Sequence, residues 1–560
     1  MKPIHRAAAH FKKGHYEHVD RICGEILVTD PTEARAWQMR GLAALYRKHF
    51  ENAGTYLQEA VLLEETPQGL TNLAVAFLAL DRPEDSIRHL EKALALDPGN
   101  AGAHLNLAAC HMRLHRYEDA EAAIEKSLEF SPDWPKATDM RARIALKRGD
   151  VERAFGLATS ALAADPSLSI SHRVLADIAM RQLNYELAEK HYQQSLENNP
   201  DDPETQGNFA LFLARSGAYK DAQLWYARAA EGLHDDAQIQ HGLADALLIQ
   251  GRLAEGWPRY SWRHFLNDGR LLVDQPVLSN LPDGPSAVAV LDQGVGDQIL
   301  MASMIPDLAV RFPALEVQCD PRLRALLQRS FPLVRFKNGI HSSTPGAPAT
   351  PGSFGLADAA RWLRADFNAF PHHRGYLKPD PDLQRELRSR YKRNSGPLVG
   401  ISWATRKSIK LGPHKSTSLA DWGPLLFMPG PTFVNLQYDS NPEEVATATQ
   451  EFGARIITDP TIDPSGALDP FAAQVAAMDL VITTSSATAH MAGALNVPTW
   501  VFVPTGIGTL WHWFLDREDS PWYPSVRLFR QTQRGEWSDV MERASLAFAE
   551  FMEAWPDQKS

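Results

Sequence analysis

Cysteine is scarce in this chain: its 560 residues include three, Cys23, Cys110 and Cys319, and no two of them form a CxxC pair. Their number and spacing argue against a disulfide-stapled secreted scaffold and against a cysteine-based zinc site. Long hydrophobic runs are absent as well, since stretches such as residues 497–504 are too short to span a bilayer. The N-terminus lacks the apolar segment typical of a signal peptide. We therefore expect a cytoplasmic protein without a membrane span.

Excess positive charge is also missing. The net charge of −11 argues against a general nucleic-acid or anionic-membrane binder. The sequence has no Walker loop, no HExxH and no GxSxG motif. Asp380 and Asp382 have the spacing of a metal-binding DxD pair, but they lie in a proline-broken segment rather than at the end of a strand. We expect neither a metal site nor a cofactor.

Prolines mark a repeat in the first half of the chain. They stand 36, 31, 34, 34 and 34 residues apart, at Pro31, Pro67, Pro98, Pro132, Pro166 and Pro200. A period near 34 is the length of a tetratricopeptide helix–turn–helix unit. An aromatic residue often opens the expected second helix, as at Tyr16, Phe50, Tyr117, Tyr185 and Tyr219. Residues 1–265 are therefore predicted to form an α-solenoid of tetratricopeptide (TPR) repeats, whose concave surface holds another polypeptide.

The periodicity changes after a stretch rich in proline, glycine and aspartate at residues 275–285. Short apolar runs then alternate with helical patterns, which predicts an α/β region with parallel strands. Strands are expected at residues 287–292, 315–319, 398–403, 432–437, 480–484 and 499–503, and helices at 298–311 and 537–555. The predicted fold class is thus α plus α/β. Two Rossmann-like lobes, over residues 266–380 and 381–560, follow the solenoid.

Small hydroxylated residues follow the expected strand at residues 480–484. Ser485 and Ser486 come directly after it, and a helix containing His490 begins near Thr488. Helix N-termini at the carboxyl ends of parallel strands bind anions such as nucleotide phosphates. We expect His490 to donate a hydrogen bond to such a phosphate. The alternative is an ordinary serine-capped turn with His490 in the core.

Two further segments follow expected strands. Gly294 and Gly296 let the backbone approach a ligand closely, and Asp297 begins a helix, where it is either a general base or a residue that favours the helix dipole. The loop at residues 403–415 carries four basic side chains, of which Lys415 and then Lys407 are the first candidates for neutralising a phosphate leaving group. Solvated surface charge is the alternative for this loop.

Several segments together resemble a bacterial family that joins TPR repeats to a GT-B glycosyltransferase related to the lipopolysaccharide heptosyltransferases. The likeness is carried by residues 251–263, 293–297, 400–403, 435–437, 479–498 and 519–531. Members with such repeats look like flagellin-modifying transferases, which attach a nonulosonic sugar such as pseudaminic acid to Ser or Thr. The resemblance implies a GT-B fold, flagellin as partner, and a nucleotide-sugar donor that Trp403 and Gln437 also contact.

The chain departs from the heptosyltransferases at one point. Ser485, Ser486 and Ala487 stand where those enzymes usually carry Asp-Thr-Gly. The missing carboxylate disfavours an ADP-heptose donor, and a CMP-linked sugar is one alternative. Two other functions remain open: a transferase that acts on lipopolysaccharide or another glycan, and a non-catalytic scaffold.

The sixth position of each repeat is expected to face the concave surface. It is asparagine in three repeats, at Asn72, Asn106 and Asn208. Asparagines there can hold an extended peptide through amide hydrogen bonds, and O-GlcNAc transferase is similar in having such a ladder. Met140 and Val174 interrupt the row, so a helical or folded acceptor is an equal alternative.

Overall fold

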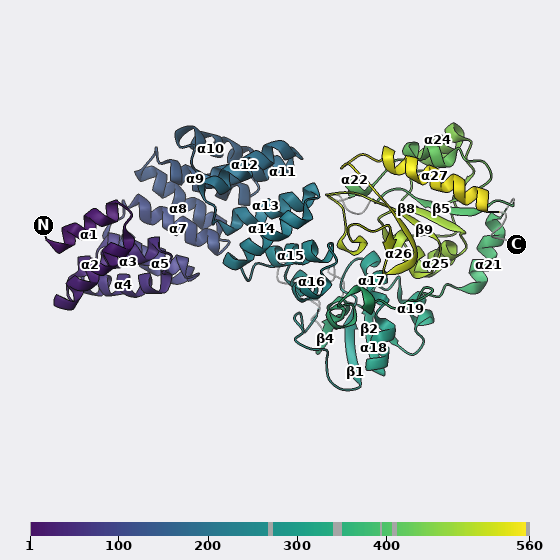
Figure 1. Ribbon diagram of the computed structural model, residues 1–560, viewed down its shortest axis with the longest axis horizontal. Coiled ribbons are helices and arrows are strands. Elements are labelled where there is room, and N and C mark those ends of the chain that lie inside the picture. The colour runs from purple at the N-terminus through teal and green to yellow at the C-terminus, as the bar shows by residue number, and fades with distance from the viewer. Residues whose placement is uncertain are drawn as a thin grey trace. The chain divides into compact units, whose positions relative to one another are not determined.

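The computed structural model describes residues 2–266, 271, 273–339, 350–392, 395–405 and 412–555. The chain divides into two compact units, Met1–Thr205 and Gln206–Ser560. Among the described residues, the first unit contains helices and turns without strands. The second unit contains the last helices of the repeat array and two β-sheets, which Figure 1 shows as separate groups of arrows.

Helical hairpins, each made of two consecutive helices, build the repeat array, as the proline period predicts. Their bounds are α1 Pro3–Lys12, α2 Tyr16–Thr29, α3 Ala34–Tyr46, α4 Phe50–Leu63, α5 Pro67–Ala79, α6 Pro83–Leu96, α7 Ala101–Arg113, α8 Tyr117–Phe130, α9 Pro135–Lys147, α10 Val151–Ala164, α11 Ser169–Arg181, α12 Tyr185–Asn198, α13 Pro203–Ser216, α14 Tyr219–Gly232, α15 Ala237–Leu248, α16 Leu253–Tyr260 and the 3₁₀ helix η1 Ser261–Phe265. The predicted aromatic residues begin α2, α4, α8, α12 and α14. The expected TPR architecture is confirmed.

Small residues let the two helices of a repeat approach closely. A Cβ atom added at Gly41 on α3 would lie 2.5 Å from Cγ of Leu57 on α4. In the next repeat, the Ser86 hydroxyl on α6 donates a 2.8 Å hydrogen bond to the Ala74 carbonyl on α5, and both residues are fully buried. Larger side chains at these positions would force the helices apart.

Charged side chains fill part of the interior of the first unit. Arg173 on α11 is 3% exposed, and its Nη1 lies 2.8 Å from Glu204 on α13. Arg143 on α9 reaches the same carboxylate at 2.7 Å. Met140 and Val174 are also buried here, so these two side chains belong to the interior and do not offer an apolar surface to a partner helix.

Two mostly parallel sheets form the α/β part of the second unit. Their strands are β1 Ser286–Val290, β2 Ala314–Cys319, β3 Arg335–Asn338, β4 Ser353–Gly355, β5 Leu398–Ser402, β6 Thr432–Asn435, β7 Ile456–Ile457, β8 Leu480–Thr484, β9 Thr499–Val503, β10 Asp519–Ser520 and β11 Tyr523–Arg530. The four-stranded sheet has the order β3-β2-β1-β4, and the seven-stranded sheet has the order β10-β11-β9-β8-β5-β6-β7. The pair β10–β11 is antiparallel, and the other pairs are parallel.

Helices connect and cover these strands. They are α17 Val295–Ala302, α18 Ile305–Arg311, α19 Arg324–Ser330, α20 Ala360–Leu363, α21 Pro381–Tyr391, α22 Gly412–Lys415, α23 Gly423–Leu426, α24 Pro442–Phe452, α25 Leu468–Ala476, α26 Ala487–Ala494 and α27 Ser538–Ala554, with 3₁₀ turns η2 Leu356–Ala359, η3 Phe367–Ala369, η4 Leu419–Trp422 and η5 Trp511–Trp513. The α/β class and the six expected strands are confirmed. The helix expected at residues 298–311 was wrong in extent, because α17 ends before Ser303 and a second helix, α18, begins at Ile305 with Pro306 in its first turn.

The end of the repeat array packs against both sheets of the second unit. Arg263 on η1 binds Asp292 after β1 at 3.0 Å and also binds Asp358. The Tyr260 hydroxyl accepts a 2.7 Å hydrogen bond from Gln293 and a 3.3 Å hydrogen bond from the Trp511 indole. The division between the compact units, at residues 205 and 206, therefore does not coincide with the domain boundary expected at residue 265.

Candidate functional site

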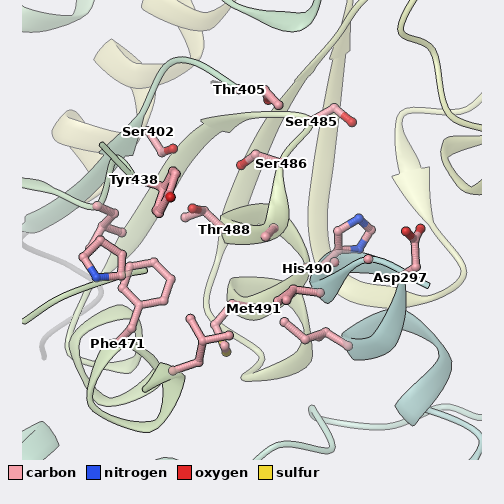
Figure 2. Close-up of a pocket in the computed structure, with 18 of the residues that line it drawn as sticks. Asp297, Ser402, Thr405, Tyr438, Phe471, Ser485, Ser486, Thr488, His490 and Met491 are labelled. Atoms are coloured by element: carbon pink, nitrogen blue, oxygen red, sulfur yellow. The ribbon is translucent and has the colours of Figure 1, made fainter. Parts of the chain in front are cut away.

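A cavity of about 430 Å³ opens where strands of both sheets end. The segments after β1, β5, β6 and β8 contribute to it, and these are the carboxyl ends where ligands bind in open α/β sheets. It is lined by residues 294–297, 299, 322, 402, 404, 405, 415, 436, 438, 464, 468, 471, 485–488, 490, 491 and 510. Figure 2 shows Asp297 and His490 toward one end of it, and Tyr438 and Phe471 toward the other.

The glycine loop after β1 places a carboxylate in this cavity. Gly294, Gly296 and Asp297 all line it, as the sequence analysis expects. Burial raises the pKa of the Asp297 carboxyl to about 6, with Lys415 opposing the rise and Asp292 adding to it. Asp297 is therefore largely ionised at neutral pH yet basic enough to accept a proton, which suits a general base.

Lys415 supplies positive charge to the same cavity. It ends α22, lines the cavity and is 8% exposed. Burial lowers the pKa of its ammonium group, and the Asp297 carboxylate acts in the opposite direction. Among the described residues, no carboxylate lies within ion-pair distance of Lys415. A buried cation that faces a cavity without such a partner can bind an anionic ligand.

The N-terminus of α26 forms another part of the wall. Ser485 and Ser486, expected at this site, line the cavity together with Ala487 and Thr488. Ser486 caps the helix without a side-chain hydrogen bond to it, so the first N–H groups of α26 keep their capacity to bind an anion. The Ser485 oxygen accepts a 2.8 Å hydrogen bond from the Trp513 indole, which leaves its own proton available.

His490 lies in the first turn of α26 and lines the cavity, but it is only 3% exposed. Its ring stacks on Trp513 with centroids 5.3 Å apart, and its Nδ1 atom lies 2.9 Å from the Tyr523 hydroxyl. A Cβ atom on Gly296 would lie 2.9 Å from the ring, so this glycine makes room for it. Burial and the positive charge of Lys415 lower the pKa of His490 to about 3. The imidazole is thus neutral at physiological pH.

Two residues expected to contact the nucleotide-sugar donor do not line this cavity. Trp403 and Gln437 lie behind the cavity wall and not on it: Trp403 is fully buried, and Gln437 is 4% exposed. The Gln437 side chain accepts hydrogen bonds from the Trp403 and Ala404 amides and donates to the Ala404 and Tyr438 carbonyls. Gln437 thus joins the ends of β5 and β6 and supports the site from behind. A contact of Trp403 or Gln437 with a donor stays a prediction.

Other expected residues lie elsewhere. Lys407 is outside the described residues. Asn72 is buried at 9% exposure and accepts a 2.9 Å hydrogen bond from Gln68, and Asn106 on α7 is partly exposed. Asn208 on α13 belongs to the second compact unit. Their binding of an acceptor stays a prediction.

Sequence reasoning missed several residues at this site. Tyr438 and Phe471 line the end of the cavity far from Asp297, and Thr405 lines its upper wall in Figure 2. Tyr523, at the start of β11, touches His490 from behind. The signal for Tyr438 was its position directly after a buried strand, whereas nothing local in the sequence marked Phe471 on α25.

Comparisons with known proteins match the repeat part of the chain. Two family models described as tetratricopeptide repeat match residues 77–144 and 173–238. The chain is 32% identical over 349 residues to Protein FlbA of Caulobacter vibrioides, a match that covers 57% of this chain and 56% of that protein. The chain thus spans about half the length of this curated relative.

Two solved structures are similar to parts of the chain. The Cut9–Hcn1 hetero-tetramer structure of the APC/C matches at 17% identity, over 44% of this chain and 49% of that chain, with a TM-score of 0.38. The type IV pilus biogenesis factor PilW matches at 24% identity, over 36% of this chain and 95% of that chain, with a TM-score of 0.32. Both likenesses are partial. In the described part of the chain, no helix has the length and apolar character needed to cross a membrane.

Proposed function

We propose that this chain is a GT-B-type protein O-glycosyltransferase that transfers a nonulosonic sugar such as pseudaminic acid from a CMP-linked donor to Ser or Thr of flagellin. One observation carries the proposal: a single cavity collects the ends of strands from two parallel sheets, with a carboxylate from one and an anion-binding helix start from the other. Such a pairing suits the transfer of a group from a phosphate to a hydroxyl.

The nucleotide end of the donor fits the part of the cavity built by the larger sheet. The first N–H groups of α26 and the Lys415 ammonium offer positive charge to a phosphate. The rings of Tyr438 and Phe471, at the other end, can stack against a nucleobase. A volume of about 430 Å³ lies in the range of small-molecule sites.

The chemistry needs one proton acceptor and one stabilised leaving group. Asp297 takes the proton of the acceptor hydroxyl while that oxygen forms a bond to the anomeric carbon of the sugar. The bond from the anomeric carbon to the phosphate oxygen breaks, and the nucleotide leaves with the electron pair. Lys415 and the α26 amides stabilise the negative charge that develops on the phosphate. This scheme places on protein groups the positive charge that a divalent ion would otherwise supply.

The repeats are proposed to recruit the acceptor protein. Helical repeat arrays present extended surfaces for other polypeptides, and TPR family models match residues 77–144 and 173–238. The match to Protein FlbA supports a flagellum-related role. Flagellin as the acceptor follows from the resemblance of the chain to flagellin-modifying transferases, and the proposal takes the location to be cytoplasmic, as expected from the cysteine content and the N-terminal sequence.

Intact-mass measurement of flagellin tests this proposal. Flagellin co-expressed with the full chain and the donor-synthesis enzymes is expected to gain the mass of one or more sugar residues. Asp297→Asn should abolish the gain, whereas the matched control Asp283→Asn, at a fully exposed acid of the same sheet region, should preserve it. Transfer by the purified protein should persist in EDTA. Unmodified flagellin alongside a glycan that acquires the sugar would replace the flagellin assignment by the glycan alternative.

A further inference from the structure

The segment that follows β9 lies between the end of the repeat array and the cavity. It comprises residues 504–510, here called the β9 loop, and its last residue, Leu510, lines the cavity. The Thr505 amide donates a 3.1 Å hydrogen bond to the side-chain oxygen of Gln531, and the Thr509 hydroxyl donates a 2.7 Å hydrogen bond to the Pro504 carbonyl. These bonds give the β9 loop a defined position between its neighbours.

The β9 loop contacts the turn between α13 and α14 at close range. The Tyr219 hydroxyl, at the start of α14, donates a 3.2 Å hydrogen bond to the Gly506 carbonyl. Gly506 has a φ of +72°, and a Cβ atom there would lie 2.4 Å from the backbone oxygen of Arg215, near the end of α13. Glycine therefore lets two backbones meet here. A side chain at this position would push the β9 loop away from the repeats.

The β9 loop also packs against the stem of Lys415. A Cβ atom at Gly508 would lie 2.6 Å from Cγ of Lys415. This atom is close to the lysine backbone and far from the flexible ammonium end, so an added methyl group would displace the whole side chain. Among the described residues, no carboxylate lies within ion-pair distance of Lys415. Packing on its stem, and not an internal ion pair, therefore determines where its ammonium group lies.

We propose that the β9 loop is a positioning element for Lys415, and that the turn between α13 and α14 holds this loop in place. The last repeats would thus set the position of the cation that binds the phosphate. The inference rests on the proposed function for the identity of the ligand. Tyr219, Gly506 and Gly508 do not line the cavity, so they act through Lys415 and are positioning residues.

The size of the effect follows from the flexibility of lysine. Its side chain has four rotatable bonds and loses conformational freedom when it is held in one place. A lysine that the protein has already ordered does not have to be ordered by the ligand. Loss of this ordering should weaken the binding of an anionic ligand by about 3- to 10-fold.

Calorimetry of the full chain with CMP tests the contact with Lys415. Gly508→Ala should bind CMP about 3- to 10-fold more weakly. Gly535→Ala is the matched control, because Gly535 has a similar φ of +83° against +86° at Gly508, and a Cβ atom there meets nothing within 4 Å. It carries the same backbone strain without the contact, so its CMP affinity should equal that of the wild type.

A second substitution separates positioning from a general effect on the fold. Lys415→Ala has no Cγ atom, so Gly508→Ala should cause no further loss of CMP affinity when it is added to Lys415→Ala. An equal loss with and without Lys415 would overturn the positioning role of the β9 loop. Circular dichroism melting checks that each variant is folded.

The contact with the repeats is tested in the same way. Gly506→Ala should weaken CMP binding as Gly508→Ala does, because the backbone oxygen of Arg215 cannot easily move aside. Tyr219→Phe, which removes one hydrogen bond and keeps the ring, should act in the same direction by less. If a folded Gly506→Ala variant bound CMP as the wild type does, the turn between α13 and α14 would not hold the loop.

A measurement without ligand keeps this inference separate from the proposed function. The pH dependence of the acetylation of Lys415 by acetic anhydride, read by peptide mass spectrometry, gives the pKa of its amine. Burial lowers this pKa and Asp297 opposes the effect. The other titratable groups that interact with Lys415 are His490 and His512, whose own pKa values are lowered by burial, so both rings are neutral.

Displacement of Lys415 into water should return its pKa toward the ordinary lysine value. We expect this rise in Gly508→Ala and Gly506→Ala and not in Gly535→Ala. An unchanged pKa of Lys415 in Gly508→Ala would overturn the inference. If the wild type does not bind CMP, the donor assignment of the proposed function fails, while the pKa of Lys415 still decides whether the β9 loop positions it.

Discussion

Arg173 in the first compact unit and Lys415 in the second are both nearly buried cations, with 3% and 8% of their surface exposed. Arg173 meets Glu204 at 2.8 Å and Asp202 at 3.6 Å. Lys415 has no carboxylate within ion-pair distance among the described residues, and it faces a cavity. A buried cation is therefore compensated by carboxylates in the first unit. In the second unit Lys415 is open, which means that no carboxylate of the described residues lies within ion-pair distance of it.

The carboxylates differ in the same way. Burial alone would raise the pKa of Glu204, but Arg173, Arg143 and Lys147 lower it to about 2. Burial raises the pKa of Asp297 to about 6 despite Lys415. The ion network lowers the pKa of Glu204, so that carboxylate stays charged at physiological pH. Burial in the cavity instead raises the pKa of Asp297 toward physiological pH, where the carboxylate can exchange a proton. The comparison thus separates charges that hold the fold from charges that serve a ligand.

The largest effect on folding is expected from comparing two N-terminally truncated fragments of the chain. A fragment of residues 266–560 loses Arg263 and His264, so the buried carboxylates of Asp292 and Asp358 lose the Arg263 guanidinium and the hydrogen bond to His264. We expect it to be insoluble or unfolded. A fragment of residues 202–560 keeps these ion pairs and the Tyr260 hydrogen bonds, and we expect it to fold and bind nucleotide, as measured by circular dichroism and calorimetry. Equal folding of both fragments would show that the end of the repeat array is dispensable for the second unit.

Asp297→Asn should give the next largest effect. Loss of a positioned base reduces turnover by about 10²–10⁴-fold, while nucleotide binding measured by calorimetry should change little. Turnover of the wild type should rise with pH through an acid limb near pH 6, where Asp297 loses its proton. A variant with near-normal turnover would return Asp297 to the role of a first-turn acid on α17.

Stability should respond to the same substitution with the opposite sign. The raised pKa means that the folded state binds a proton more tightly than the unfolded state, so this carboxyl stabilises the fold at low pH and opposes it as the pH rises through about 6. Asp297→Asn should therefore stabilise the protein at pH 7, by up to about 3 kcal/mol. Thermal melting at pH 5 and pH 8 checks this, and a gain that is larger at pH 5 would contradict the assignment of the shift.

Periodic features of this fold could be predicted from the sequence. The helix pairs followed from proline spacing and aromatic starts, and the strands β5, β8 and β9 followed from short buried apolar runs. The position of the candidate site followed from the rule that ligands bind at the carboxyl ends of parallel strands. Asp297, Ser486 and Lys415 were found because each stands directly after a strand or inside a loop with evident chemistry.

Contacts between distant segments could not be predicted. Tyr219 and Gly506 are 287 positions apart in the sequence, and only the fold brings them within hydrogen-bond distance. The sequence of Tyr523–Arg530 contains Pro524 at its second position, which disguised β11, a strand paired with both β10 and β9. Met140 and Val174 occupy a repeat position that was expected to face the concave surface, and they are buried because each packs in a cluster of apolar side chains. Gln437 was identified, but its hydrogen-bond partners were not.

Removing Arg173 tests the compensated half of the comparison. Arg173→Met leaves Glu204 and Asp202 with fewer partners, and breaking a buried ion pair costs about 3–5 kcal/mol. Arg113→Met, which breaks an exposed pair with Asp81, should cost less than about 1 kcal/mol. Urea unfolding followed by circular dichroism measures both. If the two variants unfolded at the same urea concentration, the network around Glu204 would contribute no more than surface charge does.

Lys415→Gln tests the open half and should give the smallest effect of the series on stability. The lysine has no internal carboxylate partner at ion-pair distance among the described residues, so its removal leaves no ion pair broken, and the end of a desolvation cost can even stabilise the fold slightly. Its loss should appear instead in ligand binding. A hydrogen bond to a charged phosphate contributes about 1.5–3 kcal/mol, which corresponds to a roughly 10- to 100-fold weaker affinity for CMP in calorimetry.

The exposed Lys337→Gln, on β3 and outside the cavity, serves as the matched control for Lys415→Gln. Unchanged CMP affinity in Lys415→Gln, with the fold intact, would show that the open cation serves Asp297 alone and that the phosphate binds elsewhere.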